Sequence, residues 1–149
     1  MQPRIEIRRK WSDDDVLLLT IQVRDGTSLF VNEAYVSRAW GSDAAEALRT
    51  FGRHVYGGIF DLQAGTEGPE YASGAFRARF HYHAPNHLLI STTQQGDHFP
   101  FKNFQVATEA RMFLRTEPAL LDRFVSALPA LDRNDGADAA LECVPLRGQ

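Results

Sequence analysis

An alternating stretch in the middle of the chain constrains the fold most strongly. From residue 76 to residue 83, apolar side chains occupy every second position and cationic or titratable side chains occupy the positions between them. The apolar set is Phe76, Ala78, Phe80 and Tyr82, and the polar set is Arg77, Arg79, His81 and His83. Successive side chains of a β-strand point to opposite faces, so the pattern predicts a strand with a buried face and a polar face.

Further strands are expected in hairpin runs on both sides of this segment. Turn chemistry at 84–87 predicts that the strand 75–83 pairs with a strand at 88–95. Near the N-terminus, alternating segments at 4–8, 16–24 and 29–37 predict a meander, with Asp25-Gly26 at one of its turns. A short strand at 59–63 and a single extended run at 101–114 complete the expected strands, and the glycine-bearing segment 64–74 is expected to be a loop.

Two amphipathic helices are expected, at about 43–56 and 117–129. In the first, Asp43 at the N-cap would place Glu46 at the third helical position, which is a capping box. In the second, Thr116 would act as the cap and Pro118 would lie in the first turn, where a missing N–H costs little. Apolar side chains recur at helical spacing in both segments.

The order of elements predicts an α+β fold, because strands in hairpin runs favour an antiparallel sheet over a parallel one. We expect one domain at 1–131, with an antiparallel sheet of about six to seven strands and both helices packed on one face. Residues 132–149 would form a polar C-terminal tail, which could add a short edge strand.

Composition narrows the classes of function. The chain has 149 residues and a formal net charge of −3, so it lacks the overall positive charge that nucleic-acid binding commonly uses. Its one cysteine, Cys143, cannot form an intramolecular disulfide, and no apolar run is long enough to span a bilayer. We expect a cytoplasmic protein with no membrane or nucleic-acid partner and no cofactor.

The histidine cluster is the sharpest candidate for chemistry. His81 and His83 share one face of a strand, and His87 follows the turn, so the three imidazoles could hold zinc or iron. Against this hypothesis, Arg77 and Arg79 lie on the same face and would repel a cation, and no carboxylate ligand follows closely. No Gly-x-Ser-x-Gly nucleophile motif is present, and Cys143 has no histidine at a fixed spacing.

Two short helical signatures carry a resemblance. A helix with Ala-Leu-Arg-x-Phe (47–51) follows the meander, and the last strand before 117 runs directly into Glu-Pro-x-Leu-Leu-x-x-Phe (117–124). Over residues 16–131 this arrangement resembles small uncharacterised bacterial α+β domains, some of which are similar to immunity proteins of polymorphic toxin systems. The resemblance implies a protein that binds a toxin's active surface and has no catalytic residues.

Two functional hypotheses therefore stand. The first is a non-enzymatic protein-binding domain, a toxin-immunity or accessory protein, that presents Arg77, Arg79, His81 and His83 to an acidic partner. Its partner could also be a second copy, since exposed strand edges and half-polar sheet faces favour self-association. The alternative is a small metal- or ligand-binding protein or enzyme built on His81, His83 and His87.

Overall fold

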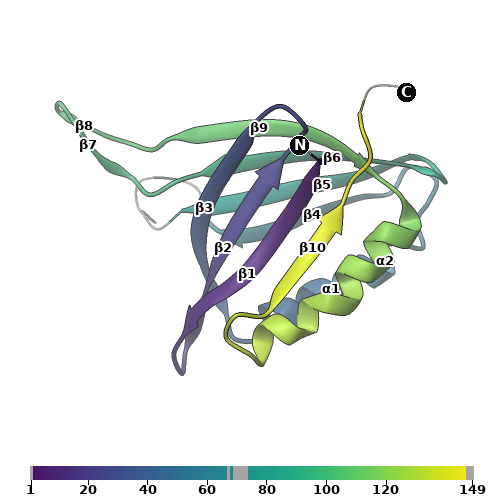
Figure 1. The fold of residues 1–149 in the computed structure, drawn as a ribbon, viewed down its shortest axis with the longest axis horizontal. Coiled ribbons are helices and arrows are strands. Elements are labelled where there is room, and N and C mark those ends of the chain that lie inside the picture. The colour runs from purple at the N-terminus through teal and green to yellow at the C-terminus, as the bar shows by residue number, and fades with distance from the viewer. Residues whose placement is uncertain (1, 67, 69–73, 147–149) are drawn as a thin grey trace.

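The computed structural model describes residues 2–66, 68 and 74–146, and these residues form an α+β fold with two layers of sheet. Two four-stranded antiparallel sheets cross each other, and two α-helices lie along the open side between them (Figure 1). A separate two-stranded hairpin projects from one end of the second sheet (Figure 1). Most of the predicted loop at 64–74 lies outside the described residues.

The first sheet has the strand order β10-β1-β2-β3, and it contains the predicted N-terminal meander. Its strands are β1 (Arg4–Ser12), β2 (Val16–Arg24), β3 (Leu29–Ser37) and β10 (Asp138–Glu142). Strand β2 alternates between fully buried aliphatic side chains and half-buried ones, as its sequence predicts. At the β2–β3 turn the Asp25 carboxylate accepts hydrogen bonds from the backbone N–H groups of Thr27 and Ser28, at 3.0 and 2.8 Å.

The second sheet has the order β4-β5-β6-β9 and contains the alternating segment. Its strands are β4 (Ile59–Gly65), β5 (Ala75–Ala84), β6 (His87–Gln95) and β9 (Glu109–Thr116). The prediction for β5 is confirmed, because Phe76, Phe80 and Tyr82 are buried while Arg77 and Arg79 are exposed. The Tyr82 ring stacks on Phe51 of the first helix, with 5.1 Å between ring centroids.

The expectation of one sheet with six to seven strands is wrong. Strands β3 and β4 belong to different sheets, and the helix between them turns the chain from one sheet to the other (Figure 1). The expected single strand at 101–114 is divided into β7 (Phe99–Phe101), β8 (Phe104–Val106) and β9. Alternation shows which face of a strand is buried but not which strands pair, and two sheets bury their apolar faces against each other as well as against the helices.

Both helices are present but shorter than expected, and the first begins earlier. Helix α1 spans Trp40–Phe51 and helix α2 spans Pro118–Ala127, followed by a 3₁₀ helix, η2, at Leu128–Asp132. Asp43 lies in the first turn of α1 and is not its cap. The Asp132 carboxylate instead accepts hydrogen bonds from the N–H groups of Gly41 and Ser42, both at 2.7 Å. A distant residue thus supplies the acceptor that the helix start requires.

A close backbone contact fixes where the two sheets cross. The Gln94 side-chain amide of β6 donates to Oδ1 of Asn32 on β3 at 2.8 Å, and Asn32 donates to the carbonyl oxygen of Ala75 at 3.2 Å. Gly74 has φ +98°, and a Cβ built on it would lie 2.0 Å from the carbonyl oxygen of Glu33. Only glycine therefore fits where β3 crosses the start of β5.

The segment after Leu131 packs against the first sheet through strand pairing and an ion pair. Strand β10 pairs with β1 in antiparallel register and buries Leu141. Before it, the nearly buried Arg9 guanidinium of β1 forms an ion pair with Asp135 at 2.7 Å and donates to the carbonyl oxygen of Leu131 at 3.2 Å. The Cys143 side chain is also buried.

Candidate functional site

The site residues proposed from sequence lie on the outer face of the second sheet, which points away from the helices. The pairing register places β5 at the centre of this face, between β4 on one side and β6 and β9 on the other. Side chains at alternate positions of the four strands therefore form rows across it. Three such rows carry the groups that could contact a ligand or a partner.

The first row is cationic. Arg77 of β5 pairs in register with Thr93 of β6, which pairs with Arg111 of β9. Both arginines are exposed, and the guanidinium of Arg111 lies 5.6 Å from the ring centroid of Phe113, within range of a cation–π interaction. Among the described residues, no carboxylate lies within 4.0 Å of either guanidinium. These two charges are available to an anionic partner.

The second row contains an ion pair. Two nitrogens of Arg79, Nε and Nη2, donate to the two carboxylate oxygens of Asp61 on β4, at 2.8 and 2.9 Å. The hydrogen bond from Arg79 lowers the pKa of Asp61, and the same bond raises the pKa of Arg79. The pair fixes the orientation of Arg79 and neutralises its charge, so Arg79 contributes geometry rather than free charge to the face.

An apolar depression lies over the Phe113 end of the second row and over a third row, in which Ile59 pairs with His81 and His81 with Leu89. It has a volume of about 530 Å³, and its lining includes Ile59, Leu89, Phe113 and Leu146 together with Arg79 and His81. All four apolar side chains are at least one-third exposed. An exposed apolar hollow with charged groups at its edge can accept a partner's apolar side chain while the arginines hold nearby anionic groups.

The structure brings two of the three histidines together. The His81 and His83 rings lie 6.4 Å apart between centroids in an edge-to-face arrangement, and His87 begins β6 on the far side of the turn. Over residues 2–66, 68 and 74–146, no group of three or more His, Cys, Asp or Glu side chains is placed to hold a metal ion. The metal hypothesis therefore gains no support from the geometry.

Outside this face, the thiol of Cys143 has a strongly perturbed pKa. Burial, followed by the nearby Glu142 carboxylate, raises its pKa to about 12, although a hydrogen bond with Thr116 acts in the opposite direction. A thiol with this pKa stays protonated at neutral pH, and the protonated form is a poor nucleophile. Cys143 is suited to packing and not to covalent catalysis.

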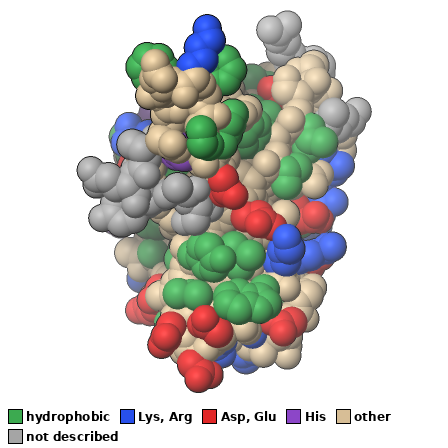
Figure 2. All heavy atoms as spheres, turned by 90° about the vertical axis from the view of Figure 1, so that its left-hand side faces the viewer, with side chains coloured by type: hydrophobic (Ala, Val, Ile, Leu, Met, Phe, Trp, Pro, Cys, Tyr) green, Lys and Arg blue, Asp and Glu red, His purple; other side chains and the backbone are tan. Residues whose placement is uncertain are grey.

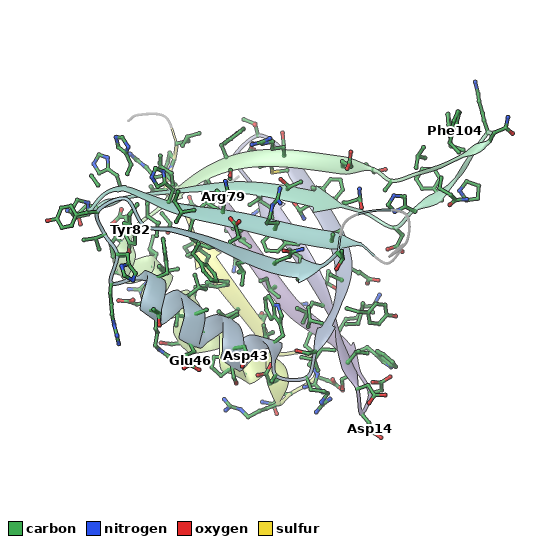
Figure 3. All side chains as sticks on the ribbon, turned by 180° about the vertical axis from the view of Figure 1, so that it is seen from behind. Asp14, Asp43, Glu46, Arg79, Tyr82 and Phe104 are labelled. Atoms are coloured by element: carbon green, nitrogen blue, oxygen red, sulfur yellow. The ribbon has the colours of Figure 1, made fainter. Side chains whose placement is uncertain are left out.

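A second hollow, of about 910 Å³, lies between the outer side of α1 and the start of β4. Asp43 and Glu46 border it from α1, and His54 and Tyr56 border it from the loop that follows (Figure 3). Sequence reasoning assigned Asp43 and Glu46 to helix capping and so missed this hollow. It opens broadly to solvent, and its exposed side chains carry both charges.

Sequence reasoning also missed the hairpin formed by β7 and β8. Phe99, Phe101 and Phe104 are 46, 56 and 68% exposed, and the hairpin extends well beyond the second sheet (Figure 3). The signal in the sequence was three phenylalanines within six residues around Lys102-Asn103. The strand expected at 101–114 includes two of these phenylalanines and so conceals the turn.

Comparison with known protein families, with curated proteins and with solved structures finds no match for this chain. In the part of the chain that the structure describes, no helix is both long and apolar enough to cross a bilayer. The function must therefore be argued from the site itself.

Proposed function

We propose that this protein is a non-enzymatic protein-binding domain whose outer face on the second sheet binds an acidic surface of a partner. The observation that carries the proposal is the row Arg77–Thr93–Arg111 beside the apolar depression. In a chain with net charge −3, this row concentrates positive charge on one sheet face. Charge of this kind steers association and sets orientation, while the buried apolar contact supplies affinity.

The chemistry of the face supports binding rather than catalysis. The guanidinium of arginine stays charged throughout the physiological pH range, so it holds anions well but exchanges protons with a substrate poorly. Arg79 is already committed to Asp61 in a two-point ion pair. The same arrangement offers an acidic peptide or protein surface two guanidinium groups at a fixed spacing, those of Arg77 and Arg111, which form no ion pair with a carboxylate of the described residues.

A protein partner fits the face better than a nucleic acid does. The hollow beside the arginines is lined mainly by aliphatic side chains, with Phe113 and the imidazole of His81 as the aromatic rings among its described lining residues. Single-stranded nucleic acids use several aromatic platforms along a basic groove, and duplexes need many phosphate contacts. A compact pair of arginines beside an aliphatic hollow matches the apolar core and polar rim of protein interfaces.

The more specific role that we propose is that of a toxin-immunity or accessory protein acting in the cytoplasm. The immunity or accessory role is supported by the resemblance that residues 47–51 and 117–124 carry. The compartment is supported by Cys143, a free buried thiol in a chain with no other cysteine. An immunity protein acts by covering the working surface of a toxin, which requires a binding face and no catalytic group.

The experiment is a comparative capture from native lysate at about 50 mM salt, with and without nuclease treatment. The bait is the wild-type protein, an Arg77→Glu/Arg111→Glu variant, or a control Arg49→Glu/Arg123→Glu variant with the same change of charge on the helices. We expect a stoichiometric protein that the wild type and the control retain and the Arg77→Glu/Arg111→Glu variant loses. Equal capture by all three baits would contradict the proposed face, and capture that nuclease abolishes would indicate a nucleic acid.

A further inference from the structure

The hairpin β7–β8 exposes more apolar surface than an isolated two-stranded ribbon can stabilise by itself. Within the described part of the chain, its strands pair only with each other, through Phe99–Val106, Pro100–Gln105 and Phe101–Phe104. Two-stranded hairpins without a packed face are marginally stable in water. Burial of the three exposed phenylalanines against another surface would therefore stabilise the hairpin.

A complementary apolar area lies on the same side of the molecule. We call it the β3 patch, and it consists of Leu29, Val31 and Tyr35 on β3 and Trp11 on β1. All four side chains are between 44 and 52% exposed, and Trp11 and Tyr35 share one row of the first sheet through Leu18. Figure 2 shows this side, where apolar side chains gather towards the hairpin at the top and again in the lower half.

We propose that the phenylalanine hairpin docks on the β3 patch of a second copy of this chain, and that the two copies are related by a two-fold axis. This closed arrangement is possible because the hairpin and the β3 patch lie on the same side of the molecule. When two complementary surfaces lie on one side of a molecule, each can meet its counterpart on the other copy at the same time. Surfaces on opposite ends would instead build open chains.

The charges of the two surfaces are complementary. Between Phe99 and Val106 the hairpin carries one charged side chain, Lys102, at its tip. The β3 patch is bordered by the acidic turn Asp13–Asp15 and by Glu33, which lies between Val31 and Tyr35 on the same face. Three cations lie near the patch: Lys10 is bonded to Glu33, Arg38 to the carbonyl oxygen of Asp13, and Arg24 pairs in register with Leu29. Against them stand the carboxylates of Asp13, Asp14, Asp15 and Glu33, so the border keeps a small acidic excess. Figure 2 shows acidic side chains next to the lower apolar area.

The backbone at Lys102 adds to the argument for a specific role of its side chain. Lys102 has φ +57°, in the left-handed region that glycine occupies at least cost. A glycine would make an easier turn, but it would remove the charge from the tip. A lysine at this strained position places an ammonium group beside the phenylalanines.

The area is sufficient for a dimer. Aromatic side chains offer roughly 150–250 Å² each. Seven large apolar side chains that are about half exposed then bury about 700 Å² on each copy, close to the roughly 800 Å² of a standard interface. The outer face of the second sheet takes no part, so a dimer would present two copies of the proposed partner-binding face.

The first test is sedimentation equilibrium of the purified full chain from 1 to 500 µM. We expect a reversible monomer–dimer equilibrium that Phe101→Ser/Phe104→Ser weakens at least tenfold and Lys102→Glu also weakens. Phe113→Ser is the matched control, because it removes an equally exposed phenylalanine from the second sheet without touching the hairpin. A wild-type protein that stays monomeric, or a dimer that only Phe113→Ser weakens, would overturn the proposal.

A mixing experiment separates the reciprocal arrangement from others. The hairpin variant Phe101→Ser/Phe104→Ser keeps its β3 patch, and a Val31→Ser/Tyr35→Ser variant keeps its hairpin. Mixing them restores one wild-type contact per pair, so the mixture should form dimers more tightly than either variant alone. No gain on mixing would refute hairpin-to-patch docking. Wild-type species larger than dimers would refute the two-fold axis, and a monomer that binds neutral phosphatidylcholine vesicles through the hairpin would assign it to lipid instead.

Discussion

The crossing of the two sheets can be tested at Gly74, where a single methyl group should force them apart. A Cβ at this position would lie 2.0 Å from the carbonyl oxygen of Glu33 on β3, whereas carbon–oxygen contacts normally begin near ~3.3 Å. Relief requires a backbone shift of about 1.3 Å in one of two packed sheets. Such a shift also stretches the hydrogen bonds that Asn32 makes with Gln94 and Ala75.

The expected cost has two parts. The left-handed backbone at φ +98° costs a residue with a Cβ about 1–2 kcal/mol. The steric displacement and the weakened buried hydrogen bonds add about 3 kcal/mol, giving a total near 4 kcal/mol. Gly57→Ala is the matched control, because Gly57 also has a positive φ, +84°, but nothing lies within 4 Å of its added Cβ. That variant should lose only the backbone part.

The assay is urea unfolding followed by far-ultraviolet circular dichroism, with the slope of the transition compared among the three proteins. We expect Gly74→Ala to unfold with a free energy about 3 kcal/mol lower than that of Gly57→Ala. If the two variants agree within about 0.5 kcal/mol, β3 does not cross the start of β5 at the distance described. The two-sheet account would then fail.

Three further predictions concern single residues. Asp132→Ala should remove the acceptor of the first N–H groups of α1 and lower stability by about 1–2 kcal/mol in thermal unfolding, whereas Asp122→Ala on the exposed side of α2 should have little effect. Burial raises the pKa of Cys143 from 9.0 to about 12, so the protonated thiol stabilises the fold fully below pH 9, and this stabilisation is lost as the pH rises towards 12. Above pH 9 the free energy of unfolding should therefore fall more steeply for wild type than for Cys143→Ala, by up to about 1.4 kcal/mol per pH unit. Because Arg79 lowers the pKa of Asp61, that ion pair stabilises the fold above pH 4, and the stabilisation is lost on acidification. Asp61→Asn should remove this small fall in the free energy of unfolding at acid pH, and an unchanged acid dependence in the variant would contradict the pair's role.

Local pattern was sufficient to predict the strand faces. Phe76, Phe80 and Tyr82 are buried and Arg77 and Arg79 are exposed because side-chain direction along a strand depends only on position parity. The predicted outer face with its arginines follows directly. The sequence did not show that Arg111, thirty-four residues from Arg77, would join the same row, because strand pairing is a long-range property.

The features that sequence reasoning missed have two causes, a distant contact and a local turn. Asp43 has the right spacing for a cap, but Asp132 from η2 takes that role and α1 starts at Trp40. The run at 101–114 alternates well enough for one strand, yet the turn at Lys102 divides it and leaves the phenylalanine hairpin exposed. Local propensity could not choose the helix start, because a contact with η2 decides it, whereas the hairpin at Lys102 is a local turn that the alternation concealed.

The most direct test of the proposed function is the affinity of the captured partner for wild type and for Arg77→Glu/Arg111→Glu, measured by titration calorimetry at 50 and 300 mM salt. If the outer face of the second sheet binds an acidic protein, wild-type affinity should fall at least tenfold with salt. The variant should bind at least tenfold more weakly at low salt and should lose most of this salt dependence. Equal affinities with equal salt dependence for both proteins would contradict the account.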